Sequence, residues 1–232
     1  MSSKTDALTA IQVVARSLAE LNENVMFVGG VVPALLVDDP AAPAPRPTDD
    51  VDIVADVVSY PDYVRLTERI RALGFAEDTS DGAPTCRWLV DAVRVDLMST
   101  GRHPGPANRW YAEAFARAAT VQLSQGTTVR MITAPYFLAT KLEAFSDGRR
   151  GDIFASHDIE DIVAVIDGRM TIVDEVLSAP SSVADYLRDA FRRLFADRDF
   201  ADAVAGHLPG DSASQARLPL VLARVRAIAQ LS

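Results

Sequence analysis

The stretch RPTDDVDIVADV, residues 46–57, places three aspartates at the start of an apolar strand. Side chains alternate between the two faces of a strand, so Asp50 and Asp52 share one face while the intervening valine points into the core. Asp49 points to the other side and is expected to lie in solvent or in a turn. Two carboxylates this close repel each other unless a cation lies between them, and hard divalent cations prefer oxygen ligands. The pattern therefore predicts a metal site on one face of this strand.

A third carboxylate lies in a second strand-like run, RVDLM, where Asp96 is flanked by two apolar residues. If this strand lies beside the first, Asp96 completes a three-carboxylate metal site. The alternative is that all three aspartates are strand-end residues in water, and a D-x-D pair alone favours this alternative. The apolar neighbours of Asp96 weigh against it, because an unpaired buried carboxylate is costly.

Gly29 and Gly30 follow the apolar run VMFV and precede a predicted helix. Glycine lets the backbone approach a ligand closely, and the N-terminus of a helix attracts phosphate oxygens. The alternative is a simple tight turn. The order of the features is more informative than any one of them: strand, Gly-Gly, helix, D-x-D on a strand, and an aspartate on a later strand.

The composition is that of an ordinary globular protein. Of 232 residues, 49% are hydrophobic and 24% charged, and the formal net charge is −9. Bulk attraction to DNA or to an anionic membrane is therefore not expected, although a local basic patch can still bind a nucleotide or RNA. The single cysteine, Cys86, excludes an intramolecular disulfide and is expected to be buried. The longest apolar run, residues 25–37, is too short to span a bilayer and no signal peptide is evident, so a cytoplasmic protein is expected.

Periodicity predicts an α+β protein with a mixed N-terminal part, residues 1–132, and an all-helical C-terminal part, residues 133–232. The dipeptide Asp91-Ala92 leaves room only for a hairpin between its flanking strands. Pro135, preceded by Thr133, and Ser156 are good starts for C-terminal helices. In the N-terminal part helices are expected at 5–21, 31–38, 60–73 and 108–118, strands at 25–30, 50–57, 85–90, 93–99 and 127–132, and an extended Pro/Ala-rich loop at 38–48.

Further along the chain, Lys141 falls on the apolar stripe of a predicted helix. A lysine there needs an anionic partner or must extend its ammonium group to the surface. Asp158 and Asp161 begin another helix, where acidic residues also favour the helix dipole, and of the two a functional role is expected first for Asp158. Arg150, in a polar loop, either binds phosphate or the acceptor or is simply solvated. The three histidines show no metal-ligand spacing.

These motifs resemble the DNA polymerase β-like nucleotidyltransferase superfamily, and within it the AbiEii/AbiGii-toxin-like proteins. The resemblance covers about residues 25–167, with an insertion between Gly30 and Asp50 that the Pro/Ala-rich loop explains. It implies a nucleotidyltransferase fold, in which helices flank a mixed β-sheet, followed by a helical bundle that completes the nucleotide site. The matching residues are Val28-Gly29-Gly30, Arg46, Thr48, Asp50-Val51-Asp52-Ile53, Asp96, Lys141, Asp158 and Asp161.

The resemblance also implies an activity: Mg²⁺-dependent transfer of a nucleoside monophosphate from an NTP to the hydroxyl group of an RNA, a protein or a small molecule. Asp50 and Asp52 would hold Mg²⁺ ions that bind the triphosphate, and Asp96 would share one ion and help to activate the hydroxyl. Lys141 and Asp158 are the other implied catalytic residues. The implied contacts to the nucleotide come from Gly29, Gly30, Thr48, Lys141 and Arg150.

Several alternatives remain open. Two of them are disfavoured: a haloacid-dehalogenase-type phosphatase needs the D-x-D pair directly after a long apolar strand, whereas APRPTD precedes it here, and an EF-hand needs glycine where Ala55 stands. A protein with this fold that binds a nucleotide or a partner without catalysis is a more serious alternative. A non-catalytic site need not retain three carboxylates that repel one another, so their presence argues against it. Among enzymes, a toxin with an antitoxin partner and an antibiotic-modifying transferase both fit, and the acidic net charge mildly disfavours tRNA as the acceptor.

Overall fold

The chain folds as two units. The computed structural model describes residues 3–101, 107–147 and 152–230. One unit comprises Met1–Val32 and Pro47–Thr133, and the other comprises Pro33–Arg46 and Ala134–Ser232. The segment Pro33–Arg46 thus belongs with the C-terminal helices, although in sequence it lies between two strands of the sheet.

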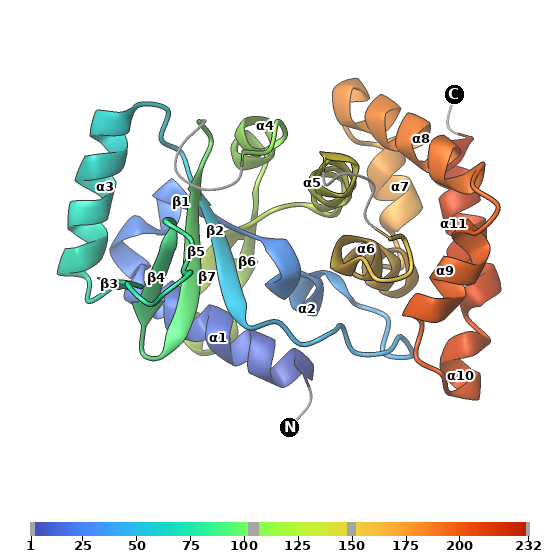
Figure 1. Cartoon of the computed structure of the whole chain (residues 1–232), viewed down its shortest axis with the longest axis horizontal. Helices are drawn as coiled ribbons and strands as arrows, with labels where there is room; N and C mark the ends of the chain where they lie inside the picture. The colour runs from blue at the N-terminus through green and yellow to red at the C-terminus, as the bar shows by residue number, and fades with distance from the viewer. Residues whose placement is uncertain (1–2, 102–106, 148–151, 231–232) are drawn as a thin grey trace. The chain divides into compact units, whose positions relative to one another are not determined.

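The first unit is built on a mixed sheet of seven strands in the order β3-β4-β5-β2-β1-β7-β6 (Figure 1). Strand β2 pairs in parallel with β5, and β1 in parallel with β7, while the remaining pairs are antiparallel. The two strands that carry the aspartates therefore lie side by side, as predicted. The strands are β1 (Val25–Val28), β2 (Asp50–Ala55), β3 (Ala76–Glu77), β4 (Arg87–Val90), β5 (Val93–Ser99), β6 (Ala119–Gln122) and β7 (Thr128–Met131).

Burial along β2 confirms the predicted alternation. Val51 and Ile53 are buried in the core, whereas Asp50 and Asp52 are only partly buried. The hairpin between β4 and β5 is also confirmed, and both residues of its turn, Asp91 and Ala92, have positive φ angles (45° and 64°). Positive φ at both central positions is what a two-residue type I′ hairpin turn requires.

Short 3₁₀ segments replace parts of two predicted helices. The helix expected at 5–21 is α1 (Ser3–Ser17) followed by η1 (Ala19–Asn24), and α1 packs against β2, β4 and β5. The helix expected at 31–38 is η2 (Gly29–Val31) followed by the single turn of α2 (Pro33–Leu36), where proline suits the first helical position. The other helices of this unit are α3 (Tyr60–Ala72), α4 (Tyr111–Ala116) and η3 (Ser124–Gly126).

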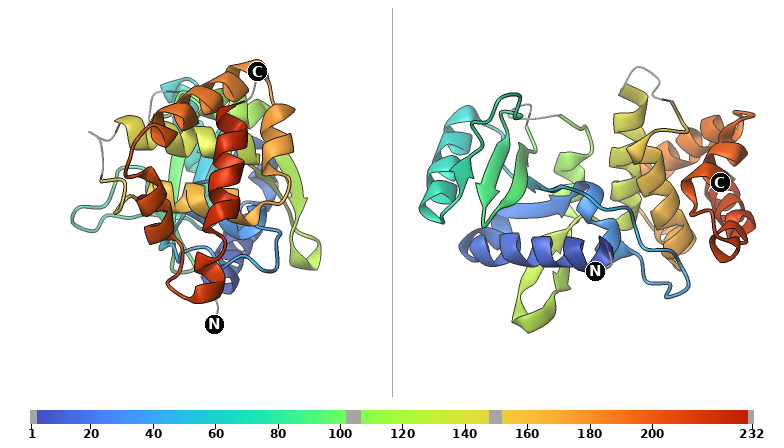
Figure 2. Two further views of the ribbon diagram at one scale, coloured as in Figure 1. Left: turned by 90° about the vertical axis from the view of Figure 1, so that its right-hand side faces the viewer. Right: turned by 60° about the horizontal axis from the view of Figure 1, so that its bottom comes forward.

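The second unit is helical, as predicted, and α5 packs on α6 while α8 packs on α11 (Figure 2). Ser156 caps α6 by accepting a hydrogen bond from the backbone N–H of Ile159, which confirms the predicted helix start. No helix in the described part of the chain has the length and apolar character needed to cross a membrane. Besides α2, the helices of the second unit are α5 (Ala134–Asp147), α6 (His157–Gly168), α7 (Ile172–Leu177), α8 (Ser181–Phe195), α9 (Phe200–His207), α10 (Ser212–Gln215) and α11 (Leu218–Ala229).

The segment Pro33–Arg46 is held to the helices by specific contacts. The backbone N–H groups of Asp38 and Asp39 donate to the carbonyl oxygen of Gly168, at 3.0 and 2.9 Å. The side chain of Asp39 accepts from Arg217 at 2.6 Å. Gly168 leaves the space for this contact, because a Cβ there would lie 2.6 Å from Cγ1 of Val37. These contacts explain why the extended loop belongs to the helical unit.

Candidate functional site

Three neighbouring strands place Arg87, Asp96 and Asp52 in one row across the sheet. Asp96 on β5 is the Cα partner of Arg87 on β4 and, on its other side, of Asp52 on β2. Directly paired residues project from the same face of a sheet, and Asp50 joins that face because it lies two residues before Asp52. The structure thus brings the three predicted carboxylates to one face of adjacent strands.

The charge partner of this face within the protein is Arg87. Its Nε donates to Asp96 Oδ1 at 2.8 Å, and its Nη2 donates to Asp96 Oδ2 at 2.8 Å and to Asp50 Oδ2 at 3.0 Å. The side chain is 16% exposed. Hydrogen bonding to Asp96 raises the pKa of Arg87 above its already high value, so the guanidinium group stays charged. Arg87 therefore links two of the three carboxylates.

Arg87 was not among the predicted site residues, although the register of the hairpin indicates its position. A two-residue turn at Asp91-Ala92 pairs residues in a register that can be counted outward, and this count puts Arg87 opposite Asp96.

Thr48 contacts the remaining oxygen of Asp50. Its hydroxyl group lies 3.2 Å from Asp50 Oδ1, as donor. Together, Thr48 and Arg87 hydrogen-bond to all four carboxylate oxygens of Asp50 and Asp96. Thr48 was predicted to contact a nucleotide, and in the structure it orients a carboxylate.

Gly29 lies directly against the carboxylate of Asp52. It follows Val28, the Cα partner of Asp52, and has a φ of +70°. A Cβ at Gly29 would lie 1.8 Å from Asp52 Oδ2, so only glycine fits. Gly30 is buried within η2. The helix expected at 31–38 is reduced to η2 and the single turn of α2. The contribution of these glycines is therefore close approach of the backbone rather than a helix dipole.

The donor set fits a divalent cation in chemical type, and the strand pairing brings it to one face of the sheet. Carboxylate oxygens are the ligands that Mg²⁺ prefers, and here they come from adjacent strands, with Gly29 leaving room beside Asp52. Over the described ranges, no three or more His, Cys, Asp or Glu side chains are already arranged to hold a metal. The oxygens of Asp50 and Asp96 are instead hydrogen-bonded to Arg87 and Thr48.

Asp49, in contrast, takes no part in this cluster. Its side chain is 86% exposed and lies 3.5 Å from the guanidinium group of Arg94, which is itself well exposed. The prediction that Asp49 lies in solvent is confirmed.

A second charged cluster lies in the helical unit. Lys141 Nζ is 2.8 Å from Asp161 Oδ2 and 3.0 Å from Asp158 Oδ1. Burial on its own lowers the pKa of Lys141, but the charges of Asp161 and Asp158 more than offset this, so the pKa lies above its usual value. The predicted inward-facing lysine has its anionic partners.

Asp161 is the centre of this cluster. It is 2% exposed, compared with 30% for Asp158. Besides Lys141 it binds Arg46, whose Nε donates to Oδ1 at 2.8 Å and whose Nη2 donates to Oδ2 at 3.1 Å. The sequence analysis put Asp158 ahead of Asp161, whereas Asp161 has the more extensive contacts.

Among the other residues singled out in the sequence, the described part of the chain includes His157, His207 and Cys86. Arg150 falls outside the described residues. His157 Nδ1 is 3.2 Å from Glu160, and His207 Nε2 is 2.7 Å from the carbonyl oxygen of Ile153, so each has a local contact. Cys86 is buried, as predicted, and burial raises the pKa of its thiol.

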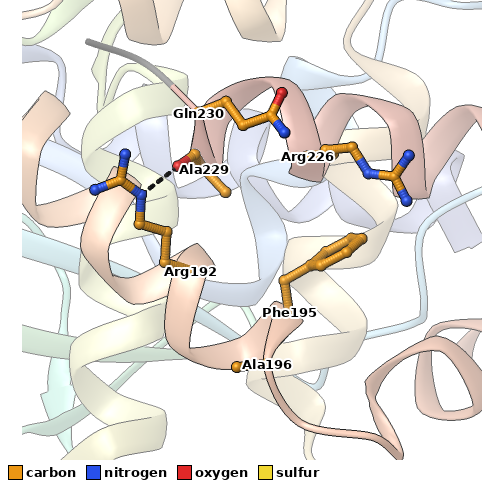
Figure 3. Close-up of a pocket in the computed structure, with 6 residues that line it drawn as sticks. All are labelled: Arg192, Phe195, Ala196, Arg226, Ala229 and Gln230. Atoms are coloured by element: carbon orange, nitrogen blue, oxygen red, sulfur yellow. Dashed lines mark hydrogen bonds between the residues drawn. The ribbon is translucent and has the colours of Figure 1, made fainter.

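A pocket of about 340 Å³ lies where the ends of α8 and α11 meet (Figure 3). The guanidinium carbon of Arg226 is 5.2 Å from the ring centroid of Phe195, and Arg192 Nε donates to the carbonyl oxygen of Ala229 at 2.6 Å. The lining contains no carboxylate and none of the predicted residues. It therefore offers no metal site.

A family model described as "Nucleotidyl transferase AbiEii toxin, Type IV TA system" matches residues 12–229, well past the last of the motifs. No curated protein sequence matches the chain.

An antigenic nucleotidyltransferase-like protein from Paracoccidioides brasiliensis has a similar fold, with 20% identity and a TM-score of 0.51 over 86% of this chain and 92% of that one. Two further structures match with lower scores. JHP933 from Helicobacter pylori has 10% identity and a TM-score of 0.48, covering 99% and 93%. ANT(2'')-Ia, solved with adenylyl-2''-tobramycin, has 16% identity and a TM-score of 0.44, covering 82% and 98%. The family model, the first of these structures and the mixed sheet of the first unit confirm the predicted α+β nucleotidyltransferase fold.

Proposed function

Because the chain belongs to the AbiEii nucleotidyltransferase toxin family of type IV toxin–antitoxin systems, we propose that it transfers a nucleoside monophosphate from an NTP to an acceptor hydroxyl group with Mg²⁺ as cofactor. The observation that carries this proposal is the row across the sheet: Asp52 and Asp96 are Cα partners, and Asp50 projects from the same face.

Asp50, Asp52 and Asp96 would hold the metal in this proposal. Bound there, Mg²⁺ would offset the charge of the triphosphate and polarise the α-phosphate for in-line attack. Asp96 is flanked by buried apolar residues on β5, which fixes its carboxylate on a rigid element. Gly29 lets the backbone come close to Asp52, and so to a phosphate group placed beside it. Thr48 holds Asp50 in its orientation.

Lys141 would supply a positive charge to the triphosphate. It stays protonated, because the charges of Asp161 and Asp158 keep its pKa above the usual value. A charged donor that is already oriented costs little reorganisation when negative charge develops on a leaving pyrophosphate. Asp158, the more exposed of its two partners, would hold the lysine until the substrate binds.

The experiment that tests the proposal is release of pyrophosphate from each of the four NTPs with Mg²⁺, in the presence of RNA, cell protein or an aminoglycoside. Replacement of Asp50, Asp52 or Asp96 by asparagine is expected to lower turnover by about 10²-fold or more. Label from the α-phosphate should appear on one acceptor class and not on the others. Equal turnover by wild type and Asp50→Asn with every acceptor would refute the proposal.

The toxin role has a separate test. Expression of the wild-type chain in a host without an antitoxin is expected to arrest growth, whereas Asp50→Asn, produced at the same level, should not. Co-expression with the cognate antitoxin should restore growth. Arrest by Asp50→Asn as strong as that of the wild type would separate the toxicity from nucleotidyl transfer.

A further inference from the structure

The guanidinium group of Arg87 binds the same oxygens that the proposed function assigns to the metal. It contacts both oxygens of Asp96 and one of Asp50, at 2.8 to 3.0 Å. These are charge-assisted hydrogen bonds on a largely buried side chain, and such bonds are stronger than neutral ones. A cation that binds these carboxylates therefore competes with Arg87 for their oxygens.

We propose that Arg87 competes with a divalent cation for Asp50 and Asp96, so that these carboxylates select a metal–nucleotide complex over the free ion. The inference rests on the proposed function in taking Asp50 and Asp96 as metal ligands. A guanidinium group and a divalent cation on the same carboxylate oxygens repel each other, so binding of the cation displaces Arg87.

A displaced guanidinium group needs another anion. The planar fork of arginine matches a phosphate group, to which it donates two parallel hydrogen bonds. A metal ion that arrives on a triphosphate brings this anion with it, whereas a free ion leaves the largely buried Arg87 without one. The cost of displacing Arg87 is therefore offset for the complex and not for the free ion.

A purely structural role for Arg87 makes a different prediction. Arg87 and Asp96 are direct cross-strand partners, and an opposite-charge pair in this position stabilises a sheet by itself. If that were its whole role, removing Arg87 would weaken the fold and would leave the affinity for metal unchanged or lower.

Affinity for Mn²⁺, measured on the full chain without nucleotide by electron paramagnetic resonance, separates the two roles. Arg87→Met is expected to bind Mn²⁺ about tenfold more tightly than wild type or better, as expected when a charged competitor is removed. The matched control is Arg94→Met, which removes the same charge from β5, where Arg94 contacts only Asp49 among the ion pairs described. Unchanged or weaker binding by Arg87→Met, or an equal gain by Arg94→Met, would overturn the proposal.

Selection for the complex is tested with Mn²⁺ bound to a non-hydrolysable NTP analogue. Relative to wild type, Arg87→Met is expected to gain less affinity for this complex than it gains for free Mn²⁺. An equal gain in affinity for both would contradict the selection. Should Arg87→Met not fold, Arg87→Lys keeps the charge without the fork, and an intermediate gain for free Mn²⁺ is expected. No gain in Arg87→Lys would then overturn the competition.

These affinities do not depend on turnover. If Arg87→Met binds free Mn²⁺ more tightly while Asp50→Asn leaves pyrophosphate release unchanged, the inference stands and the proposed function falls. If Asp50→Asn abolishes turnover while Arg87→Met binds Mn²⁺ as wild type does, the function stands and the inference falls.

Discussion

Lys141 Nζ lies 2.8 Å from Asp161 Oδ2, and the carboxylate of Asp161 also binds the guanidinium group of Arg46. One nearly inaccessible carboxylate thus joins α5, α6 and the segment Pro33–Arg46. Removing one partner of a buried ion pair leaves uncompensated charge, which is strongly destabilising.

Asp161→Asn is therefore expected to lower the free energy of unfolding by about 3 kcal/mol, as for other broken buried pairs. Asp158→Asn is the matched control, because it removes the more exposed partner of the same lysine and should cost about 1 kcal/mol or less. Urea unfolding followed by circular dichroism measures both values. An equal loss for the two variants would show that Asp161 is not the centre of the cluster.

Gly29→Ala is expected to destabilise the first unit severely. The new Cβ meets the carboxylate of Asp52, and alanine pays for a positive φ as well. Gly126→Ala isolates the second effect, because Gly126 has a φ of +76° with open space where its Cβ would lie. Its expected cost is about 1 kcal/mol. The midpoint of thermal unfolding should fall far more for Gly29→Ala, and similar midpoints would mean that Asp52 moves aside freely.

Lys141→Arg separates charge from position. Arginine keeps the positive charge beside Asp161 and Asp158, so most of the stability should remain, but its guanidinium group cannot occupy the place of a compact ammonium group. Turnover of NTP is expected to fall by about 10²-fold, as for loss of one preorganised donor. Lys141→Met should lose both stability and turnover. Full turnover by Lys141→Arg would restrict Lys141 to a structural role.

The ion pair of Asp39 and Arg217 should make stability depend on pH. The hydrogen bond from Arg217, helped by the backbone N–H of Ala41, holds the pKa of Asp39 below its ordinary value of 3.8. Because the pKa is lowered on folding, ionised Asp39 stabilises the fold at pH values above 3.8. This contribution is lost as the pH falls through the lowered pKa. The difference in stability between wild type and Asp39→Asn should therefore be constant near neutral pH and shrink in acid. A difference that grows in acid would have the wrong sign.

Cys86 is expected to be inert in the folded protein. It is buried, and burial raises the pKa of its thiol, so little of the reactive thiolate is present near neutral pH. A disulfide reagent should modify it only after unfolding, and the rate should follow the opening of the β4–β5 hairpin. Rapid modification of the native protein would contradict the burial.

Local rules predicted much of the candidate site. The alternation of β2 separated Asp49 from Asp50 and Asp52, and the two-residue turn fixed the hairpin that carries Asp96. The inward position of Lys141 predicted either an anionic partner or extension to the surface, and two carboxylates are present. Each of these inferences depends on neighbours within one element or across one turn.

What the sequence did not predict depends on contacts between distant segments. Arg46 and Asp161 are separated by 115 positions, and no local pattern links them.

Two strands were not predicted for a different reason. Strand β3 has two exposed residues, and β6 has no fully buried one, so neither produces a hydrophobic pattern. Arg87 is the instructive exception, because the register of the hairpin contained its position and only its chemistry was overlooked.

The path of the chain has one further consequence. It passes from one unit to the other after Val32, after Arg46 and after Thr133. A cut after Thr133 therefore does not separate the units, because the N-terminal fragment keeps Pro33–Arg46 while Asp161 and Arg217, which bind that segment, lie in the other fragment. The N-terminal half would contain the whole of the first unit, whereas the C-terminal half would lack the Pro33–Arg46 part of the second. The helical unit is thus complete only where both halves are present, and an exchange of one half between related chains would have to preserve the partners of Arg46 and Asp39.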